Sequence, residues 1–282
     1  MQIELRDLSY IYAPGTPYEA HALKSLSMTV ERGEFVGIMG RTGCGKSTLI
    51  QLIAGLLKPT EGQILLDGED INDKRYDRAA LRRKLGVVFQ FPEIQLFETT
   101  VARDVAFGLK HFDWTAAEKD AAAREALEKL GFDYDKIKDK SPLGFSGGEK
   151  RRIAIAGVLA AKPEILILDE PVAGLDPLGR SAFLRLLDEL NQNGVTILMI
   201  SHSADALAEH ARRIVILKDG QILRDGLMEE VFSDYSGLKA QGVDPGQVRE
   251  TAELLRQKGL EIPQTTVRYE QLLDALSGRD AP

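Results

Sequence analysis

Short runs of apolar and β-branched residues in the first third of the chain are separated by glycine, proline and aspartate, which is typical of strands and turns. Some of these runs alternate polar and apolar residues, whereas FVGIMG is apolar throughout. A helix is expected to begin at about Gly45, shortly after that run. The predicted strands of this part span residues 2–12, 22–31, 34–40, 62–71 (divided by a turn at Asp67-Gly68) and 85–90.

The middle of the chain changes to helical periodicity and then to strands that are apolar throughout. Residues 164–170 and 195–201 carry nearly uninterrupted apolar side chains, which indicates strands buried on both faces. Residues 178–194 between them predict an amphipathic helix that ends at Gly194. The other candidate helices of this part span residues 99–112, 115–132 and 147–161.

The last part of the sequence predicts a short helix at 204–211 and a hairpin at 213–226, with Asp219-Gly220 at its turn. Beyond Gly237 the residues become polar, and two short helical patterns at 246–258 and 267–277 predict a helical appendage. Because strands alternate with helices over most of the chain, the expected fold class is α/β.

Composition and charge narrow the class of protein. The 282 residues carry a formal net charge of −7 and a pI near 5.3, which argues against nucleic-acid binding over the whole surface. A single cysteine, Cys44, cannot form an internal disulfide and fits a reducing compartment. No apolar run is long enough to span a bilayer, and MQIELRDLSY lacks the apolar core of a signal peptide, so we expect no direct membrane span.

A phosphate-binding loop is predicted where the apolar strand passes into the first helix. The segment GRTGCGKST fits G-x-x-x-x-G-K-[ST] in the strand-to-helix context that this motif requires. Its backbone N–H groups and the helix N-terminus would bind phosphate oxygens, the lysine would reach the β- and γ-phosphates, and the serine would bind Mg²⁺. The residues are Gly40, Arg41, Thr42, Gly43, Cys44, Gly45, Lys46, Ser47 and Thr48. Cys44 occupies a variable position of the loop, and a regulatory thiol is the less favoured interpretation.

Acidic and imidazole groups follow the two fully apolar strands. The strand ILILD delivers Asp169 and Glu170 at its carboxyl end, where open α/β sheets bind ligands. Asp169 would hold Mg²⁺, and Glu170 would accept a proton from the attacking water. Alone, the Asp-Glu-Pro sequence would equally fit a polar exit from a strand, and the phosphate loop favours the catalytic interpretation. His202 ends the second apolar strand, and we expect it to touch the γ-phosphate, although a structural histidine is the alternative.

A second anion site is predicted in the segment FSGGEKRR, where Ser146, Gly147 and Gly148 open a helix. The nucleotide already has its phosphate loop about one hundred residues earlier. Two anion sites for one nucleotide suggest a two-molecule arrangement, in which the Ser146 loop of one chain closes on the nucleotide held by another.

These motifs together resemble the ATP-binding-cassette (ABC) ATPases, in the family's order: GRTGCGKST, Gln90, FSGGEKRR, ILILDEP, GLDP and His202. The resemblance covers about residues 1–235. It implies a P-loop NTPase cassette with a RecA-like core sheet, an antiparallel β subdomain and a helical signature subdomain. It also implies an ATPase domain at 1–237, with its helical subdomain at about 91–161. The C-terminal helical extension at 238–282 is expected to serve in dimerisation, and a merely stabilising appendage is the alternative.

The resemblance assigns roles to individual residues and implies ATP and Mg²⁺ as ligands. Gln90 would reach Mg²⁺ and the attacking water, and Asp176 would be the D-loop residue of the nucleotide site. Tyr12 would stack on adenine, with Tyr10 and Tyr18 as alternatives and a strand aromatic in the core as the other interpretation of Tyr12. The usual LSGGQ signature reads FSGGE here, so Phe145 and Glu149 depart from the pattern. Glu149 would place a carboxylate near the ribose of the partner's nucleotide.

Within this family the sequence looks like the ATPase subunits of energy-coupling factor (ECF) vitamin transporters, and the GTPYE insertion is similar to that of their second ATPase paralogue. The resemblance implies a heterodimer with a related ATPase subunit, a transmembrane coupling protein and a substrate-capture membrane protein, at the cytoplasmic face of the cell membrane. The alternatives are the ATPase of a conventional ABC transporter and, less favoured, a soluble ABC protein that acts on ribosomes or DNA.

The segment VVFQFPEIQLFETTV, residues 87–101, places several apolar residues around a proline after Gln90. Each of them, taken singly, is better explained as core. As a group beside Gln90 they suit a docking groove for a helix of a membrane partner, and Phe91 and Phe97 are the candidate contacts.

Overall fold

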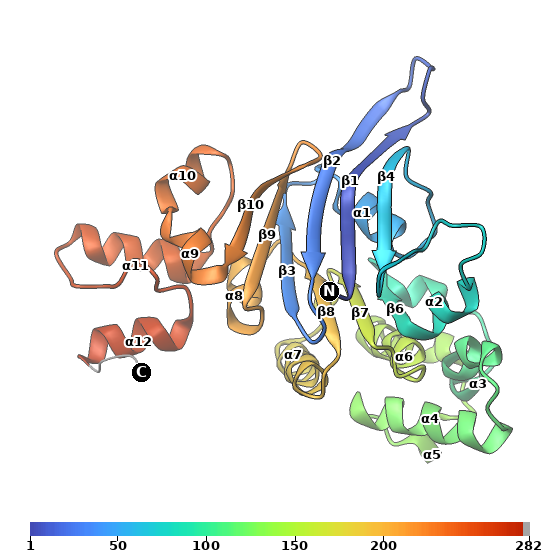
Figure 1. The fold of residues 1–282 in the computed structure, drawn as a ribbon. Helices are drawn as coiled ribbons and strands as arrows, with labels where there is room; N and C mark the ends of the chain where they lie inside the picture. Colours follow the sequence, from blue (N-terminus) through green and yellow to red (C-terminus); the bar gives the residue numbers. More distant parts are fainter. Residues whose placement is uncertain (279–282) are drawn as a thin grey trace. The chain divides into compact units, whose positions relative to one another are not determined.

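A computed structural model of the chain describes residues 1–278 and divides into two compact units (Figure 1). The first unit comprises residues 1–30, 34–68 and those from 199 onward, and the second comprises residues 31–33 and 69–198. The last four residues of the predicted extension 238–282 lie outside the described residues.

An antiparallel sheet forms the N-terminal part of the first unit. Its strands lie in the order β2-β1-β4, and Ile3 of β1 pairs with Val30 of β2 and with Leu66 of β4. Alternating residues of β1 are buried along its first half, as the sequence pattern predicts for a strand with one solvated face. The strands are β1 (Ile3–Tyr12), β2 (Ala20–Val30) and β4 (Glu61–Leu66).

Parallel pairing begins in the first unit at β3, which is buried along its whole length. β3 runs parallel to β9, and β10 returns antiparallel to β9 through a turn at Asp219-Gly220, where both residues have positive φ angles of 50° and 82°. The predicted hairpin is therefore confirmed. Helices α1 and α8 contact β3, and α9 contacts β9 and β10. The elements are β3 (Phe35–Gly40), α1 (Lys46–Ile53), α8 (Ala204–His210), β9 (Arg213–Lys218), β10 (Gln221–Leu227) and α9 (Met228–Ser233).

The described part of the C-terminal extension, together with the end of the preceding segment, forms the helices drawn in orange to red in Figure 1. Ala252, Ile262 and Leu272 form a small core of their own between the last two helices. The Asp205 carboxylate of α8 accepts hydrogen bonds from the N–H groups of Gln247 and Val248 at 2.9 and 3.0 Å, which fastens the start of α11 to α8. The helices are α10 (Tyr235–Ala240), α11 (Gln247–Gln257) and α12 (Tyr269–Ser277), and the last two confirm the predicted patterns.

The second unit contains the fully buried strand β7, which pairs in parallel with β6 and neighbours β8. The predicted strand 85–90 is too long, because β6 ends at Val88. Phe91 adopts a left-handed φ of 58°, and Pro92 begins a 3₁₀ turn, so Gln90 lies in a bend rather than at a strand end. The elements are β5 (Glu69–Asp70), α2 (Arg78–Lys84), β6 (Leu85–Val88), β7 (Ile165–Asp169), α7 (Pro177–Gln192) and β8 (Thr196–Ile200).

A helical subdomain fills the rest of the second unit. Helix α6 contacts α3, α4 and the 3₁₀ helix η1. The predicted helix 99–112 divides, since α3 ends at Ala106 and a 3₁₀ helix that contains Gly108, a poor helix former, continues it. The elements are η1 (Pro92–Gln95), α3 (Val101–Ala106), η2 (Phe107–His111), α4 (Ala116–Lys129), α5 (Tyr134–Ile137), η3 (Pro142–Gly144) and α6 (Gly147–Leu159).

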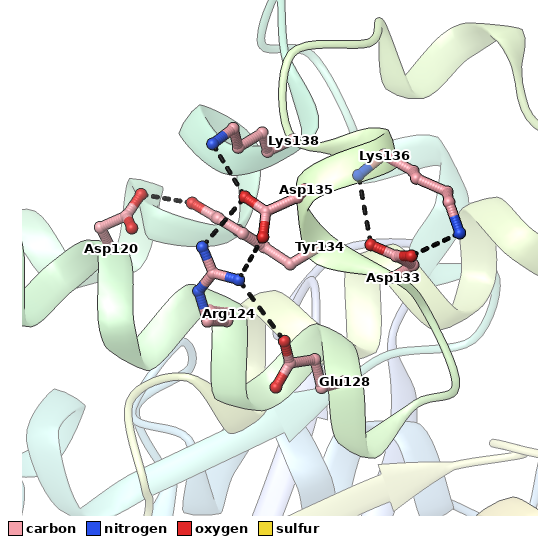
Figure 2. A network of polar contacts seen from close by, with 8 residues as sticks. All are labelled: Asp120, Arg124, Glu128, Asp133, Tyr134, Asp135, Lys136 and Lys138. Carbon is pink, nitrogen blue, oxygen red and sulfur yellow. Dashed lines mark hydrogen bonds and ion pairs between the residues drawn. The ribbon is translucent and has the colours of Figure 1, made fainter.

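A polar network fastens α5 to α4 in this subdomain (Figure 2). The buried ring of Tyr134 lies 4.4 Å beneath the Arg124 guanidinium, and its hydroxyl donates to Asp120. Arg124 also makes two hydrogen bonds to Asp135 at 2.7 and 3.1 Å. Burial and the Asp120 carboxylate raise the pKa of Tyr134, while the hydrogen bond from Arg124 lowers the pKa of Asp135. The position of α5 against α4 is therefore fixed both by the packing of the Tyr134 ring and by charged hydrogen bonds.

Candidate functional site

The phosphate loop has the backbone geometry that its motif predicts. β3 ends at Gly40, and Gly45 is the N-cap of α1 with a left-handed φ of 107°. A Cβ at Gly45 would lie 2.5 Å from the carbonyl oxygen of Ala22, so only glycine fits there. The hairpin turn supports the loop, because the Gly220 N–H donates to the Cys44 carbonyl at 3.2 Å.

Lys46 supplies a positive charge inside this loop. Its side chain is 8% exposed, and its ammonium group donates to the carbonyl oxygens of Gly40 at 2.6 Å and Arg41 at 3.0 Å. The Cys44 thiol lies 3.8 Å away. These partners are uncharged, whereas a buried ammonium is best stabilised by an anion, so the loop fits a phosphate group.

Tyr12 lies beside the phosphate loop at the end of β1. Its hydroxyl is 3.1 Å from Thr48 Oγ1, and its ring meets Tyr10 edge-on at 4.8 Å. Tyr12 remains 40% exposed, which leaves ring surface for stacking, whereas Tyr18 in the loop after β1 is 85% exposed. The geometry favours Tyr12 over Tyr18 as the adenine-stacking residue, which stays a prediction.

His202 and the tip of the phosphate loop line one cavity of about 450 Å³ in the first unit. The Ser201 N–H donates to the Ile38 carbonyl of β3 at 3.3 Å, which brings His202 to the same end of that strand as Gly40. The hairpin and the C-terminal extension complete the cavity wall with Leu217, Lys218, Asp219, Gln241, Gly242, Val243 and Asp244.

The contribution of the extension to this wall is not predicted by the sequence analysis. Lys218 Nζ donates to Gln241 Oε1 at 2.6 Å, a bond between residues 23 positions apart. Neither residue belongs to a motif, so only the folded chain reveals the contact.

The segment FSGGEKRR begins helix α6, as predicted. Ser146 is its N-cap, and the Glu149 carboxylate accepts hydrogen bonds from the Ser146 N–H at 2.9 Å and the Ser146 hydroxyl at 2.7 Å. The Glu149 N–H donates in return to Ser146 Oγ at 3.4 Å, which completes a capping box, and the bonds from Ser146 lower the pKa of Glu149. Glu149, which departs from the usual signature, therefore has a local structural partner. Asp176 similarly caps α7 and accepts from the Gly179 N–H at 2.9 Å.

The two predicted acidic residues follow the buried strand β7. Asp169 is its last residue and is buried, and Glu170 is half-buried with a left-handed φ of 50°. Such a backbone is uncommon for a residue other than glycine and tends to occur at functional sites.

Gln90, the predicted ligand of Mg²⁺ and of the attacking water, has an exposed side chain, as does Ile94 four residues later.

Arg151 contacts the predicted base, although it belongs to none of the site residues that the sequence motifs indicate. It lies on α6 and donates to the carbonyl oxygen of Glu170 at 2.6 Å. The sequence does contain a pattern that could have identified Arg151. Arg151, Ile155 and Leu159 follow one another at intervals of four on the buried side of α6. A charged residue on an otherwise apolar helical stripe indicates a specific polar partner.

The predicted residues divide between the two units. Tyr12, the phosphate loop and His202 belong to the first unit, where Tyr12 contacts Thr48 and His202 lines one cavity with the loop. The other predicted groups belong to the second unit, and they are Gln90, the Ser146–Glu149 signature, Asp169, Glu170 and Asp176.

Comparisons with known proteins agree on the family. The model of the ABC transporter family matches residues 23–173. The chain is 43% identical to the energy-coupling factor transporter ATP-binding protein EcfA2 of Clostridium perfringens, over 98% of this chain and 97% of that protein. It is 44% identical to the EcfA2 protein of Symbiobacterium thermophilum, over 99% of this chain and 96% of that one.

Solved structures show the same fold. The cbiO1 structure from Clostridium perfringens, described as part of the ABC transporter complex cbiONQ, superposes with a TM-score of 0.72 at 38% identity and covers 84% of this chain and 93% of its own. A dimeric post-hydrolysis state of the ATP-binding cassette MJ0796 bound to ADP and Pi superposes with a TM-score of 0.73 at 31% identity, over 80% of this chain and 98% of that one. The α/β cassette fold is confirmed, and the chain belongs to the ABC transporter ATPase family, among the energy-coupling factor transporter ATP-binding proteins.

Proposed function

We propose that this chain is the ATP-hydrolysing motor subunit of an ECF-type transporter, which couples hydrolysis to uptake of vitamins or other micronutrients by membrane partners. The observation that carries the proposal is the phosphate loop, with a buried Lys46 ammonium among neutral partners beside Tyr12 and His202. The similarity to ECF transporter ATP-binding proteins extends over nearly the full length of those relatives, and it supports this subfamily over the alternatives.

ATP would bind with its phosphates on the loop Gly40–Thr48 and its adenine against Tyr12. Ser47 at the start of α1, Asp169 at the end of β7 and Gln90 offer the oxygen ligands that Mg²⁺ prefers. When bound, Mg²⁺ would neutralise negative charge on the phosphate oxygens. Lys46 would leave the carbonyls of Gly40 and Arg41 for the β- and γ-phosphates.

Hydrolysis would use Glu170 as the general base for the attacking water, with Gln90 and His202 orienting the water and the γ-phosphate. Ser146, Gly147 and Gly148 would close on the nucleotide held by a second, related ATPase subunit. Asp176 would lie at the same shared site. The MJ0796 cassette, which was solved as a dimer with ADP and Pi, supports such a two-molecule arrangement.

The membrane partners would contact the segment after Gln90. Phe91 and Phe97 are 51% and 61% exposed, so neither is a core residue. Phe97 stacks edge-on against Phe107 at 4.6 Å, and the Asp104 carboxylate holds the Phe97 and Glu98 N–H groups at 2.9 and 2.7 Å. This ordered, exposed aromatic surface suits a transmembrane coupling protein, which binds a separate substrate-capture protein.

Within residues 1–278 no helix combines the length and the apolar composition that crossing a bilayer requires. We propose that the chain reaches the cytoplasmic face of the membrane through its partners and that the extension contributes to pairing with the second ATPase subunit.

The proposal is tested by co-purifying the tagged chain with its membrane and ATPase partners and measuring turnover of the complex. Glu170→Gln should retain ATP binding and lower kcat by about 100-fold or more, because the water loses its base. The chain alone should hydrolyse ATP far more slowly than the mixture with its partner subunit. Wild-type turnover in Glu170→Gln, or full activity of the dilute single chain, would contradict the shared-site mechanism.

The docking surface is tested separately by replacing Phe91 and Phe97 with serine. Because both side chains are exposed, we expect weaker assembly with the membrane partner and little change in ATP affinity. An equal loss of assembly and of ATP affinity would mean that Phe91 and Phe97 support the fold of the ATPase itself.

A further inference from the structure

Arg151 is a buried cation whose hydrogen bonds go to backbone carbonyl oxygens. It is 3% exposed, and it donates from Nη2 to the Glu170 carbonyl at 2.6 Å and from Nε to the Pro171 carbonyl at 3.1 Å. Burial lowers the pKa of its guanidinium. Burying a charge is unfavourable unless hydrogen bonds and an opposite charge compensate for the lost hydration, whereas an aliphatic residue would fit the same helical stripe as Ile155 and Leu159 without that cost.

The backbone that Arg151 holds belongs to the proposed base. Glu170 has a φ of 50°, a conformation that persists only when the surroundings fix it. Besides Arg151, the Ala173 N–H binds the same carbonyl at 3.3 Å. Because the backbone at Glu170 determines the direction in which its side chain leaves the chain, the guanidinium of Arg151 helps to aim the carboxylate.

The third contact of Arg151 leads to the segment after Gln90. Its Nη1 lies 3.7 Å from Oε2 of Glu93, and that oxygen is buried and accepts no hydrogen bond from the described residues. Glu93 lies in the short helix η1 and stands in the sequence between the exposed residues Phe91 and Phe97. One guanidinium therefore touches both the proposed docking segment and the backbone of the proposed base.

We propose that Arg151 is a positioning residue that holds the Glu170 backbone in its left-handed conformation and that its ion pair with Glu93 transmits movement of the docking segment to the base. This inference rests on the proposed function, in which Glu170 is the base. It adds a direct connection within the second unit between the surface that would meet a membrane partner and the group that would activate water.

The experiment measures ATP affinity and kcat for variants of the assembled complex. Arg151→Ala should lower kcat about 30-fold or more and change the Kd for ATP less than about threefold, since the base is misdirected while the phosphate loop is intact. Added guanidinium at about 20 mM, far below denaturing concentrations, should restore part of kcat by filling the vacated site. Arg151→Lys retains the charge but not the planar fork, and we expect an intermediate kcat.

Arg249 provides the matched control for loss of a buried arginine. It is 1% exposed, donates to the Phe232 and Ser233 carbonyls at 2.9 and 3.4 Å, and pairs with Glu253 at 3.4 Å. None of these partners belongs to the proposed site. Arg249→Ala should lower the Tm as Arg151→Ala does, and added guanidinium should not raise its kcat.

The outcomes separate this inference from the function on which it rests. If Glu170→Gln retains turnover, the base assignment itself is wrong. If Glu170→Gln is inactive but Arg151→Ala and Arg151→Lys both keep kcat within about threefold of wild type, only the positioning role is overturned. Equal guanidinium responses in the Arg151 and Arg249 variants would also overturn it.

Glu93→Gln tests the connection to the docking segment. It removes the charge that faces Arg151 with little change in volume. We expect kcat to fall about threefold to tenfold in the complex with the membrane partners and to change less in the pair of ATPase subunits alone. Equal kcat for this variant and wild type in the full complex would overturn the transmission step.

Discussion

Helices α4 and α6 begin with nearly the same arrangement of atoms, yet only α6 carries a motif. At α4, the Glu118 carboxylate accepts from the Thr115 N–H at 2.6 Å and the Thr115 hydroxyl at 2.8 Å. At α6, the Glu149 carboxylate accepts from the Ser146 N–H at 2.9 Å and the Ser146 hydroxyl at 2.7 Å. Both are capping boxes, and both satisfy backbone donors that a helix start leaves open.

The residues that follow the caps make the difference. Two alanines follow Thr115, whereas Gly147 and Gly148 follow Ser146. A Cβ at Gly147 would meet no atom within 4 Å in this chain, so packing inside the chain does not require glycine there. The open space beside the start of α6 agrees with the proposed contact to the phosphate of a second nucleotide site. Local capping geometry alone does not identify such a site.

The largest expected effect comes from removing the two capping hydroxyls. Ser146→Ala and Thr115→Ala should each destabilise the fold by about 1 kcal/mol, because each helix loses its N-cap acceptor. Only Ser146→Ala should also lower kcat of the assembled complex, by about 10- to 100-fold, because it removes a hydroxyl that would turn from Glu149 to donate to the transferred phosphoryl group. Thermal unfolding and steady-state ATP hydrolysis on the same preparations separate the two effects.

The comparison would fail if Thr115→Ala lowered kcat as much as Ser146→Ala. That result would mean that the start of α6 affects turnover only through the stability of the helical subdomain.

A smaller effect, with the opposite sign, is expected at the acidic member of each box. Glutamine can still accept the cap hydrogen bonds, so Glu149→Gln and Glu118→Gln should leave the fold almost unchanged. At α6 the substitution removes a negative charge from the proposed phosphate site, and KM for ATP should fall about threefold to tenfold. Glu118→Gln at α4 should leave KM for ATP unchanged. Titrating ATP with the assembled complex at fixed, low salt measures both variants.

An unchanged KM in Glu149→Gln would place the Glu149 carboxylate away from the nucleotide. Its departure from the usual signature would then be explained by helix capping alone.

The sequence predicted the features that depend on local patterns, namely the buried strands, the Gly45 and Ser146 helix starts and the Asp219-Gly220 turn. It failed where a distant or unusual backbone contact decides the structure. The strand before Gln90 ends early, and Phe91 shortly after it has a left-handed backbone conformation. The residues around Phe91 are apolar, so the sequence pattern does not reveal that the strand has ended. Arg151 acquires its role from Glu170, nineteen positions away. No short pattern encodes such a contact, because it forms only when α6 packs beside the end of β7.

The smallest expected effect is the pH dependence of the two boxes, in which α4 and α6 should behave alike. The hydrogen bonds from Thr115 lower the pKa of Glu118, and those from Ser146 lower the pKa of Glu149. A carboxyl whose pKa is lower in the folded state stabilises that state above its unfolded pKa, and the contribution is lost as the pH falls through the folded pKa. The Tm difference between wild type and each Glu→Gln variant should therefore be present at pH 7 and shrink towards pH 3. Because both carboxylates are largely in solvent, the change should not exceed about 2 °C at either helix. A larger shift at Glu149 than at Glu118 would show that charge at the start of α6 acts on more than its own helix.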